Sequence, residues 1–315
     1  PLGSICTHRT TPHNTVHMTA ALRAAFAGSR RGAISRAGLH PLVVPLAEVE
    51  GGTVLGSLSW RLDATGDPGD APASASEATL VEVQRGGLFV RPLGTPAHVA
   101  RRAAVEADLA GGDGAAEAVS FFSAAAVEAG GLPYTRGAHA ESGLSLDQFL
   151  LLRVGPFADC WARLSADRVS RGDTTAGLIA AERGSARNPG WGCCLLAQAR
   201  MLSELRRLEE ARDVALSALE TPFWTFGAPV SEAQSLAQLS RVEDVRALLR
   251  QVQAQGDEKR GVKVAPEEVW RRAALDLMDD VVLRGGEWGE ISADLAKALE
   301  RAGLQEQAER VRGGG

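Results

Sequence analysis

The second half of this chain carries an imperfect recurrence, and no other feature constrains the fold as strongly. Ala176 precedes Ala211 by 35 positions, and Pro189 precedes Pro222 by 33 positions. In both copies small residues recur at three- or four-residue spacing, so they lie on one face of a helix. A period of this length is typical of helical hairpins that stack on one another and share a continuous core. The sequence therefore predicts a stack of α-helical hairpins.

The second copy, LEEARDVALSALETP, resembles the second helix of a tetratricopeptide (TPR) repeat. Ala211, Ala215 and Ala218 supply the small residues that let two helices approach closely. The resemblance covers Ser145 to Gly315 and implies TPR-like hairpins with a concave binding face. It departs from the TPR pattern at Arg206, which stands where the turn glycine would be. An irregular helical bundle is the alternative that the residues leave open.

Upstream of the helices, alternating apolar runs predict a small antiparallel sheet of three or four strands between Pro41 and Leu93. The glycine pair at 51–52 and the Arg-Gly-Gly turn at 85–87 indicate two hairpins. Two Ala-rich helices follow, the first with Thr95 as its N-cap and Pro96 at its first position. So small a sheet must pack against other elements to be stable.

Together these patterns predict an α+β fold that is mainly α. We expect a disordered basic leader at residues 1–39, a small β module with two Ala-rich helices at 40–143, and a TPR-like helical domain at 144–315. The leader is free of acidic residues and rich in Arg and Ser, which is the composition of an organelle transit peptide. A disordered tail or the remnant of an expression tag, suggested by the initial PLGS, are the alternatives.

The whole layout, from the leader through HPLVVPLA to the repeat-like tail, resembles plastid TPR accessory and assembly proteins of plants and green algae. This resemblance implies a chloroplast location, in the stroma or at the thylakoid surface, with the cytoplasm as the alternative. It also implies a non-enzymatic scaffold that binds protein partners and assists the assembly of a photosynthetic complex.

Catalytic and cofactor motifs are absent from the sequence. It contains no phosphate-binding G-x-x-x-x-G-K-[ST], no G-x-S-x-G, no C-x-x-C and no H-E-x-x-H. His13 and His17 are four residues apart but have no acidic or cysteine ligand nearby. We therefore expect no catalytic residue, no cofactor and no metal. A net charge of −5 without a basic stripe argues against nucleic acid, and no apolar run is long enough to span a membrane.

Four residues of the helical half are candidates for partner contact: Trp191, Trp224, Phe226 and Arg200. Tryptophan and arginine are enriched among the residues that dominate binding energy at interfaces, although these aromatics could equally fill the core between hairpins. Cys193 lies near a predicted helix N-terminus, where a thiol can become reactive, so a redox role is a second reading beside core packing.

Two other functions are left open. An enzyme site could lie where the β module meets the helices and use His40 or His98 with a cysteine. A helical-repeat RNA-binding factor would need a basic concave face. The arginines that could form one interleave with glutamates, for example Arg206 and Arg207 with Glu204 and Glu209.

Overall fold

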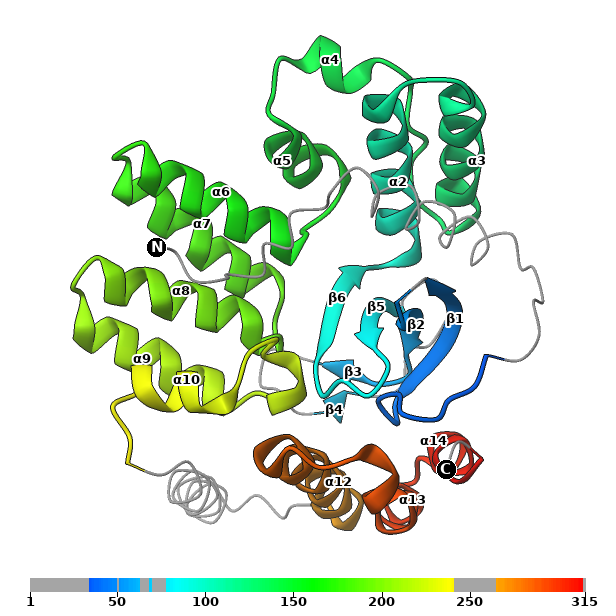
Figure 1. The fold of residues 1–315 in the computed structure, drawn as a ribbon, viewed down its shortest axis with the longest axis vertical. Helices are drawn as coiled ribbons and strands as arrows, with labels where there is room; N and C mark the ends of the chain where they lie inside the picture. The colour runs from blue at the N-terminus through cyan, green and yellow to red at the C-terminus, as the bar shows by residue number, and fades with distance from the viewer. Residues whose placement is uncertain (1–33, 50, 63–67, 70–77, 241–264, 314–315) are drawn as a thin grey trace.

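The computed structural model describes residues 34–49, 51–62, 68–69, 78–240 and 265–313. Most of the predicted leader, 1–39, lies outside these residues. Along the described chain a small antiparallel sheet is followed by helices, which confirms the predicted fold class. The sheet lies at the centre of the molecule, with helical groups above it, beside it and below it (Figure 1).

The sheet has four strands in the order β1-β2-β5-β6: β1 Val43–Val49, β2 Thr53–Leu58, β5 Thr79–Gln84 and β6 Val90–Gly94. Both predicted hairpins are present, because β1 pairs with β2 and β5 pairs with β6. Gly51 and Gly52 have φ of 88° and 79°, a backbone conformation that glycine adopts without strain. A two-residue pair, β3 Arg61–Leu62 and β4 Pro68–Gly69, lies beside the main sheet.

Two helices, α2 Pro96–Ala110 and α3 Ala115–Glu128, form a hairpin above the sheet. The N-cap is the predicted one, since the Thr95 hydroxyl accepts a hydrogen bond of 3.4 Å from the backbone N–H of His98. The chain then passes through α4 Ala138–Ser142, α5 Leu146–Phe149 and η1 Leu150–Val154. Pro156 follows η1, and the next helix begins two residues later.

Two helical hairpins come next and lie beside the sheet in Figure 1: α6 Ala158–Ser170 with α7 Thr174–Arg187, and α8 Gly192–Glu204 with α9 Leu208–Leu219. They are followed by a short turn of helix, η2 Phe223–Thr225, and by α10 Val230–Leu236. Equivalent positions of the two hairpins are 34 residues apart. For example, the turn between the helices contains a residue with positive φ in both copies, Gly172 in the first and Arg206 in the second.

The buried small residues follow the same register. Gly177, Ala181 and Gly184 are buried on α7, and their counterparts 34 positions later on α9 are Ala211, Ala215 and Ala218. The predicted alignment of Ala176 with Ala211 is therefore one residue out of register. A Cβ atom at Gly177 would lie 2.5 Å from Cγ2 of Val169, so glycine is what lets α7 approach α6 this closely.

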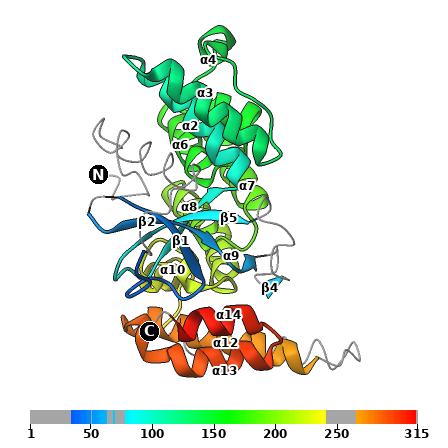
Figure 2. The ribbon, with the colours of Figure 1, turned by 90° about the vertical axis from the view of Figure 1, so that its right-hand side faces the viewer.

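The C-terminal helices are α12 Pro266–Arg284, α13 Ser292–Arg301 and α14 Gln305–Arg312, with η3 Trp288–Ile291 between the first two. They form a layer below the sheet and α10 (Figures 1 and 2). The indole N–H of Trp288 donates a hydrogen bond of 3.0 Å to the Gly87 carbonyl, which fixes this layer to the β5–β6 turn.

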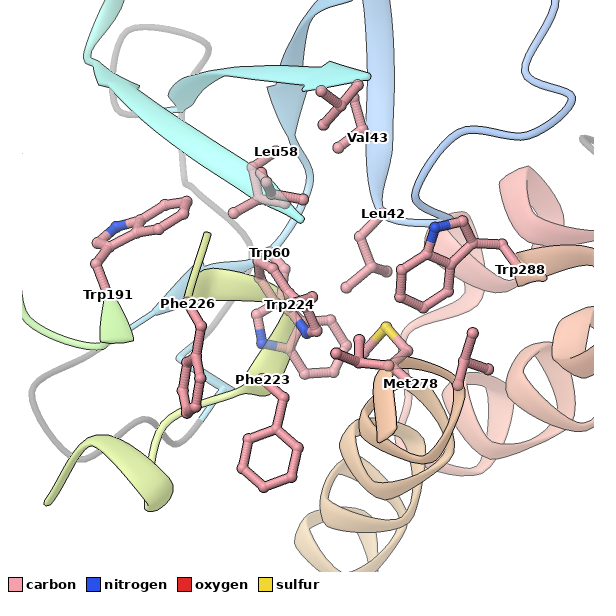
Figure 3. Close-up of a cluster of buried hydrophobic side chains, with 14 of the residues drawn as sticks. Leu42, Val43, Leu58, Trp60, Trp191, Phe223, Trp224, Phe226, Met278 and Trp288 are labelled. Atoms are coloured by element: carbon pink, nitrogen blue, oxygen red, sulfur yellow. The ribbon is translucent and has the colours of Figure 1, made fainter. Parts of the chain in front are cut away.

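The largest hydrophobic core lies where sheet, hairpins and C-terminal layer meet. Figure 3 shows side chains from the sheet, from η2 and from α12 gathered around Trp224, which is fully buried. The carboxylate of Asp279 on α12 accepts a hydrogen bond of 2.6 Å from the backbone N–H of Phe223. The sheet, η2 and α12, which are distant in sequence, pack together in this core.

His40 is buried in the same core, with its ring 4.5 Å from that of Trp224 and 4.7 Å from that of Trp288. Its Nδ1 accepts a hydrogen bond from the backbone N–H of Leu42. Burial lowers the pKa of His40 from 6.5 to about 3, because the charged imidazolium loses its hydration there. The residue is therefore a neutral core histidine near neutral pH.

Candidate partner-binding groove

A cavity of about 310 Å³ lies between strand β6 and helices α6 and α8, and we call it the α6–α8 groove. Residues of α6 and α8 line it, together with Phe89, Val90 and Pro92 of the β5–β6 hairpin. Most of its lining is apolar. The volume is at the lower end of the range for ligand pockets, and the groove is partly open to solvent.

Small residues create the groove. On α6, Ala158, Ala162 and Ala166 line it, and on α8 Cys193 and Ala197 do so. Residues four apart lie on the same face of a helix, so each helix presents a continuous strip of short side chains. Larger side chains at these positions would fill the space against β6.

The two arginines that line the groove are each paired with a glutamate. Arg91 forms an ion pair with Glu82 across two strands of the sheet. Arg200 binds Glu232 of α10 through two hydrogen bonds, one of them 2.7 Å between Nη2 and Oε2. Because these charges are neutralised locally, the groove favours an apolar occupant over an ionic one.

Trp161 lines the groove from α6 and has an indole N–H with no acceptor among the described residues. A Cβ atom at Gly184 would lie 2.9 Å from Cβ of Trp161, so the glycine of α7 makes room for this side chain. The structure places it at a surface cavity, where a large aromatic side chain can contact a bound segment.

Of the four residues predicted to contact a partner, only Arg200 lines the groove. Trp191, Trp224 and Phe226 are buried in the core, with the rings of Trp191 and Trp224 6.2 Å apart. Their burial favours the alternative that these aromatics fill the core, and a partner contact at these positions stays a prediction. The aromatic loop after α9 is covered by the C-terminal layer, which no local sequence pattern reveals.

The described chain matches two family models in tandem. The model described as PAB N-terminal matches residues 11–153, and that described as PAB middle domain matches residues 158–243. The Arabidopsis thaliana protein named "Protein IN CHLOROPLAST ATPASE BIOGENESIS, chloroplastic" is 32% identical over 277 residues, which are 86% of this chain and 77% of that protein. The chain belongs to the PAB family. No solved structure matches it.

The PAB relative is a chloroplast protein, which confirms the predicted location. In this PAB chain the groove lies between the two matched regions, because β6 belongs to the N-terminal one and both α6 and α8 to the middle one. None of the described helices is long and apolar enough to cross a membrane.

Cys193 and Cys194 both line the groove. The side chain of Cys193 is partly exposed, whereas that of Cys194 is buried. A hydrogen bond with Cys194 lowers the pKa of the Cys193 thiol against the opposing effect of burial, and Arg200 contributes in the same direction. Cys160 is fully buried, and burial raises the pKa of its thiol. A redox role for Cys193 stays a prediction.

The two histidines of the enzyme alternative lie in different surroundings. His40 is packed between two tryptophans, whereas His98 lies on α2 with its ring 6.3 Å from that of Phe157. Among the described residues no group of His, Cys, Asp and Glu could hold a metal ion. The pair His13 and His17 lies outside the described part of the chain.

The arginines of the RNA-binding alternative are largely engaged by acids. Arg207 forms an ion pair with Glu210 on α9, and Arg212 lies 3.9 Å from Glu209. A free basic stripe on the concave face, which RNA binding would require, is not formed by these residues.

Proposed function

We propose that this PAB-family chain is a non-enzymatic assembly factor for the chloroplast ATPase, acting in the stroma or at the thylakoid surface. In this proposal the α6–α8 groove holds an apolar segment of an unassembled ATPase subunit. The observation that carries the proposal is an open apolar groove between the two family regions of a chain whose relative is named for chloroplast ATPase biogenesis.

The hairpin geometry supports a TPR-like reading of the groove. Helices α6 and α8 are the first helices of two hairpins in a 34-residue register, which is the length of a TPR repeat. In such stacks the first helices line the concave face, and that face binds extended or helical polypeptides. The groove lies on these two helices.

The chemistry of the groove fits a subunit surface that becomes buried on assembly. Such a surface exposes aliphatic side chains before its partner arrives, and exposed apolar surface favours aggregation. The strip formed by Ala162, Ala166 and Ala197 can cover a few aliphatic side chains without a charge that would need neutralising. Binding by apolar contact alone leaves affinity moderate, so the segment can be released to its final partner.

A groove-filling variant tests the proposal. We expect Ala162→Trp to lower binding of fragments of the ATPase subunits, displayed as overlapping peptides, by at least tenfold. The matched control is Ala293→Trp, which adds the same side chain at an exposed position of α13 away from the groove. Equal binding by wild type and Ala162→Trp, with both proteins folded by circular dichroism, would reject the groove as the binding site.

Chemical blocking of the groove gives an independent measurement. Alkylation with N-ethylmaleimide should attach a bulky group to Cys193 and weaken peptide binding, because this thiol lines the groove. The Cys193→Ser variant should bind peptides normally and be insensitive to the reagent. Loss of binding in the alkylated Cys193→Ser protein would show that another thiol is responsible.

A further inference from the structure

A second cavity, of about 980 Å³, lies between the start of α2, the η1 segment and the end of α7, and we call it the arginine pocket. Four arginines line it: Arg101 from α2, Arg153 from η1, and Arg183 and Arg187 from α7. The lining residues that the structure describes include no Asp or Glu. The pocket therefore concentrates positive charge in a chain whose net charge is negative.

These four arginines form no ion pair with any described residue, in contrast to Arg102, the neighbour of Arg101. Arg102 binds Asp159 through two hydrogen bonds of 2.8 Å and also binds Glu106. The Nε of Arg101 is buried and has no acceptor among the described residues. An anion in the pocket would supply the acceptors that the protein itself lacks.

The arrangement carries an electrostatic cost. Arg183 and Arg187 are four residues apart on α7, and like charges at this spacing destabilise a helix. Burial lowers the pKa of Arg101 from its ordinary value, and burial together with Arg101 lowers the pKa of His98 in the same pocket. Clustered cations without a counter-charge are a cost that a bound anion offsets.

The pocket also has apolar lining residues, and these favour an anion that carries apolar groups over one that does not. Leu132 and Leu152 line it with 67% and 69% of their surfaces exposed, more than the other large apolar residues of the described chain. A phosphate or a nucleic-acid backbone has no group to cover these leucines. A polypeptide that carries carboxylates beside aliphatic side chains matches both features, because guanidinium groups bind carboxylates in a bidentate fashion.

From this combination we infer that the arginine pocket is a docking site for an acidic segment of a protein partner, one in which Asp or Glu alternates with aliphatic residues. Trp161 lines both this pocket and the α6–α8 groove, so the two sites adjoin. The inference rests on the proposed function in one respect, that the acidic segment belongs to the partner whose apolar segment occupies the α6–α8 groove. The apolar part of that partner then lies in the groove and its acidic part in the arginine pocket.

The test uses the full chain and a short fluorescein-labelled peptide of Glu and Leu, with binding followed by fluorescence anisotropy. We expect the double variant Arg183→Gln, Arg187→Gln to weaken binding at least tenfold, and wild-type binding to weaken steeply with added salt. Both side chains are exposed, so thermal unfolding of the variant should stay close to wild type. The Arg183→Lys, Arg187→Lys variant keeps the charge but loses bidentate geometry, and it should bind with intermediate affinity.

The matched control is Arg207→Gln with Arg212→Gln, which removes the same charge from α9, an element that does not contribute to the pocket. This variant should bind within about twofold of wild type. Equal losses in the two double variants would show a nonspecific charge effect and overturn the inference. Tighter binding of inorganic polyphosphate than of the peptide would also overturn it, as would an unchanged affinity in the Arg183, Arg187 variant.

The two proposals fail separately. If the Glu-Leu peptide binds the arginine pocket while no ATPase subunit fragment binds the chain, the proposed function fails and the pocket stands. If subunit fragments bind in an Ala162-dependent manner and the peptide does not bind, the groove stands and the pocket fails.

Discussion

The carboxylate of Asp159 on α6 accepts two hydrogen bonds of 2.8 Å from the guanidinium of Arg102 on α2. The same carboxylate accepts a bond of 2.8 Å from Arg163, which also binds Asp147. This network joins the helical hairpin above the sheet to the first helix of the repeats. It therefore links the N-terminal region to α6, one of the helices that line the groove.

We expect Asp159→Asn to lower the free energy of unfolding by about 2–4 kcal/mol, because it leaves two partly buried arginines without their shared counter-charge. The control is Asp167→Asn, whose ion pair with Arg171 is exposed and should be worth less than about 1 kcal/mol. Urea unfolding of the three proteins at pH 7 provides the comparison. Similar losses in both variants would mean that the network adds no specific stability.

The same carboxylate predicts a response to acid. Although burial alone would raise the pKa of Asp159, Arg102 and Arg163 hold it well below its usual range. A depressed carboxyl pKa contributes stability that is present above the unfolded-state pKa of about 4 and is lost as the pH falls below it. The stability difference between wild type and Asp159→Asn should therefore shrink below pH 4, and a constant difference down to pH 2.5 would contradict the assignment.

A second pH dependence, at milder acidity, belongs to His40. Its pKa falls from 6.5 to about 3 on folding, so the unfolded chain binds the proton more tightly. The stability that its neutral form gives is present above pH 6.5 and is lost as the pH falls towards 3. We expect wild type to lose about 2–3 kcal/mol from this residue between pH 7 and pH 4.5.

The His40→Asn variant is the control for this prediction. Its amide oxygen can replace Nδ1 as acceptor for the Leu42 N–H, and it does not titrate. The variant should be less stable than wild type at pH 7 and should lack this part of the pH dependence. Parallel stability curves for the two proteins between pH 7 and pH 4.5 would show that His40 does not cause the loss.

The turn between α8 and α9 offers a stabilising change. Arg206 has φ of 61°, and left-handed backbone at a residue with a Cβ costs about 1–2 kcal/mol. Because glycine also increases the entropy of the unfolded chain, we expect Arg206→Gly to stabilise the fold by a net amount of about 0.5–1 kcal/mol. The reciprocal change, Gly172→Ala at the equivalent turn, should destabilise by about 1 kcal/mol, as measured by thermal unfolding. A destabilised Arg206→Gly would mean that the arginine side chain contributes more than its backbone costs.

Local patterns were sufficient to predict much of this fold. The two sheet hairpins and the cap at Thr95 depend on residues near one another in sequence, and the structure confirms both. The register of the repeat differs from the predicted one by one residue, because the position that matches Ala211 is Gly177 and a glycine adds no side chain to the small-residue pattern. In the structure that glycine lies on the contact face with α6, at a position where a side chain would not fit.

The sites were harder to predict because their residues come from separate elements. Trp224 and Phe226 are buried by distant segments, since Trp224 packs against His40 and Phe226 lies against the start of α8, and nothing in their own segment signals this. The arginine pocket collects side chains from α2, η1 and α7, so no single segment shows a basic motif. The alanines of α6 that line the groove gain their role only from the position of β6 across from them, which the segment's own sequence does not reveal.

The packing of Gly192 leads to the final prediction. This residue begins α8, and a Cβ atom there would lie 2.4 Å from Cδ1 of Phe226 and 2.6 Å from Oγ1 of Thr221. Both neighbours are buried, so they cannot move aside without disturbing the core around Trp224.

We expect Gly192→Ala to lower the free energy of unfolding by about 1–3 kcal/mol through overpacking. Gly289→Ala, where no atom lies within 4 Å of the added Cβ, should change stability by less than about 0.5 kcal/mol. Chemical denaturation of both variants measures the two changes in the free energy of unfolding. Equal and small changes would show that the start of α8 accommodates the added methyl group without loss of stability.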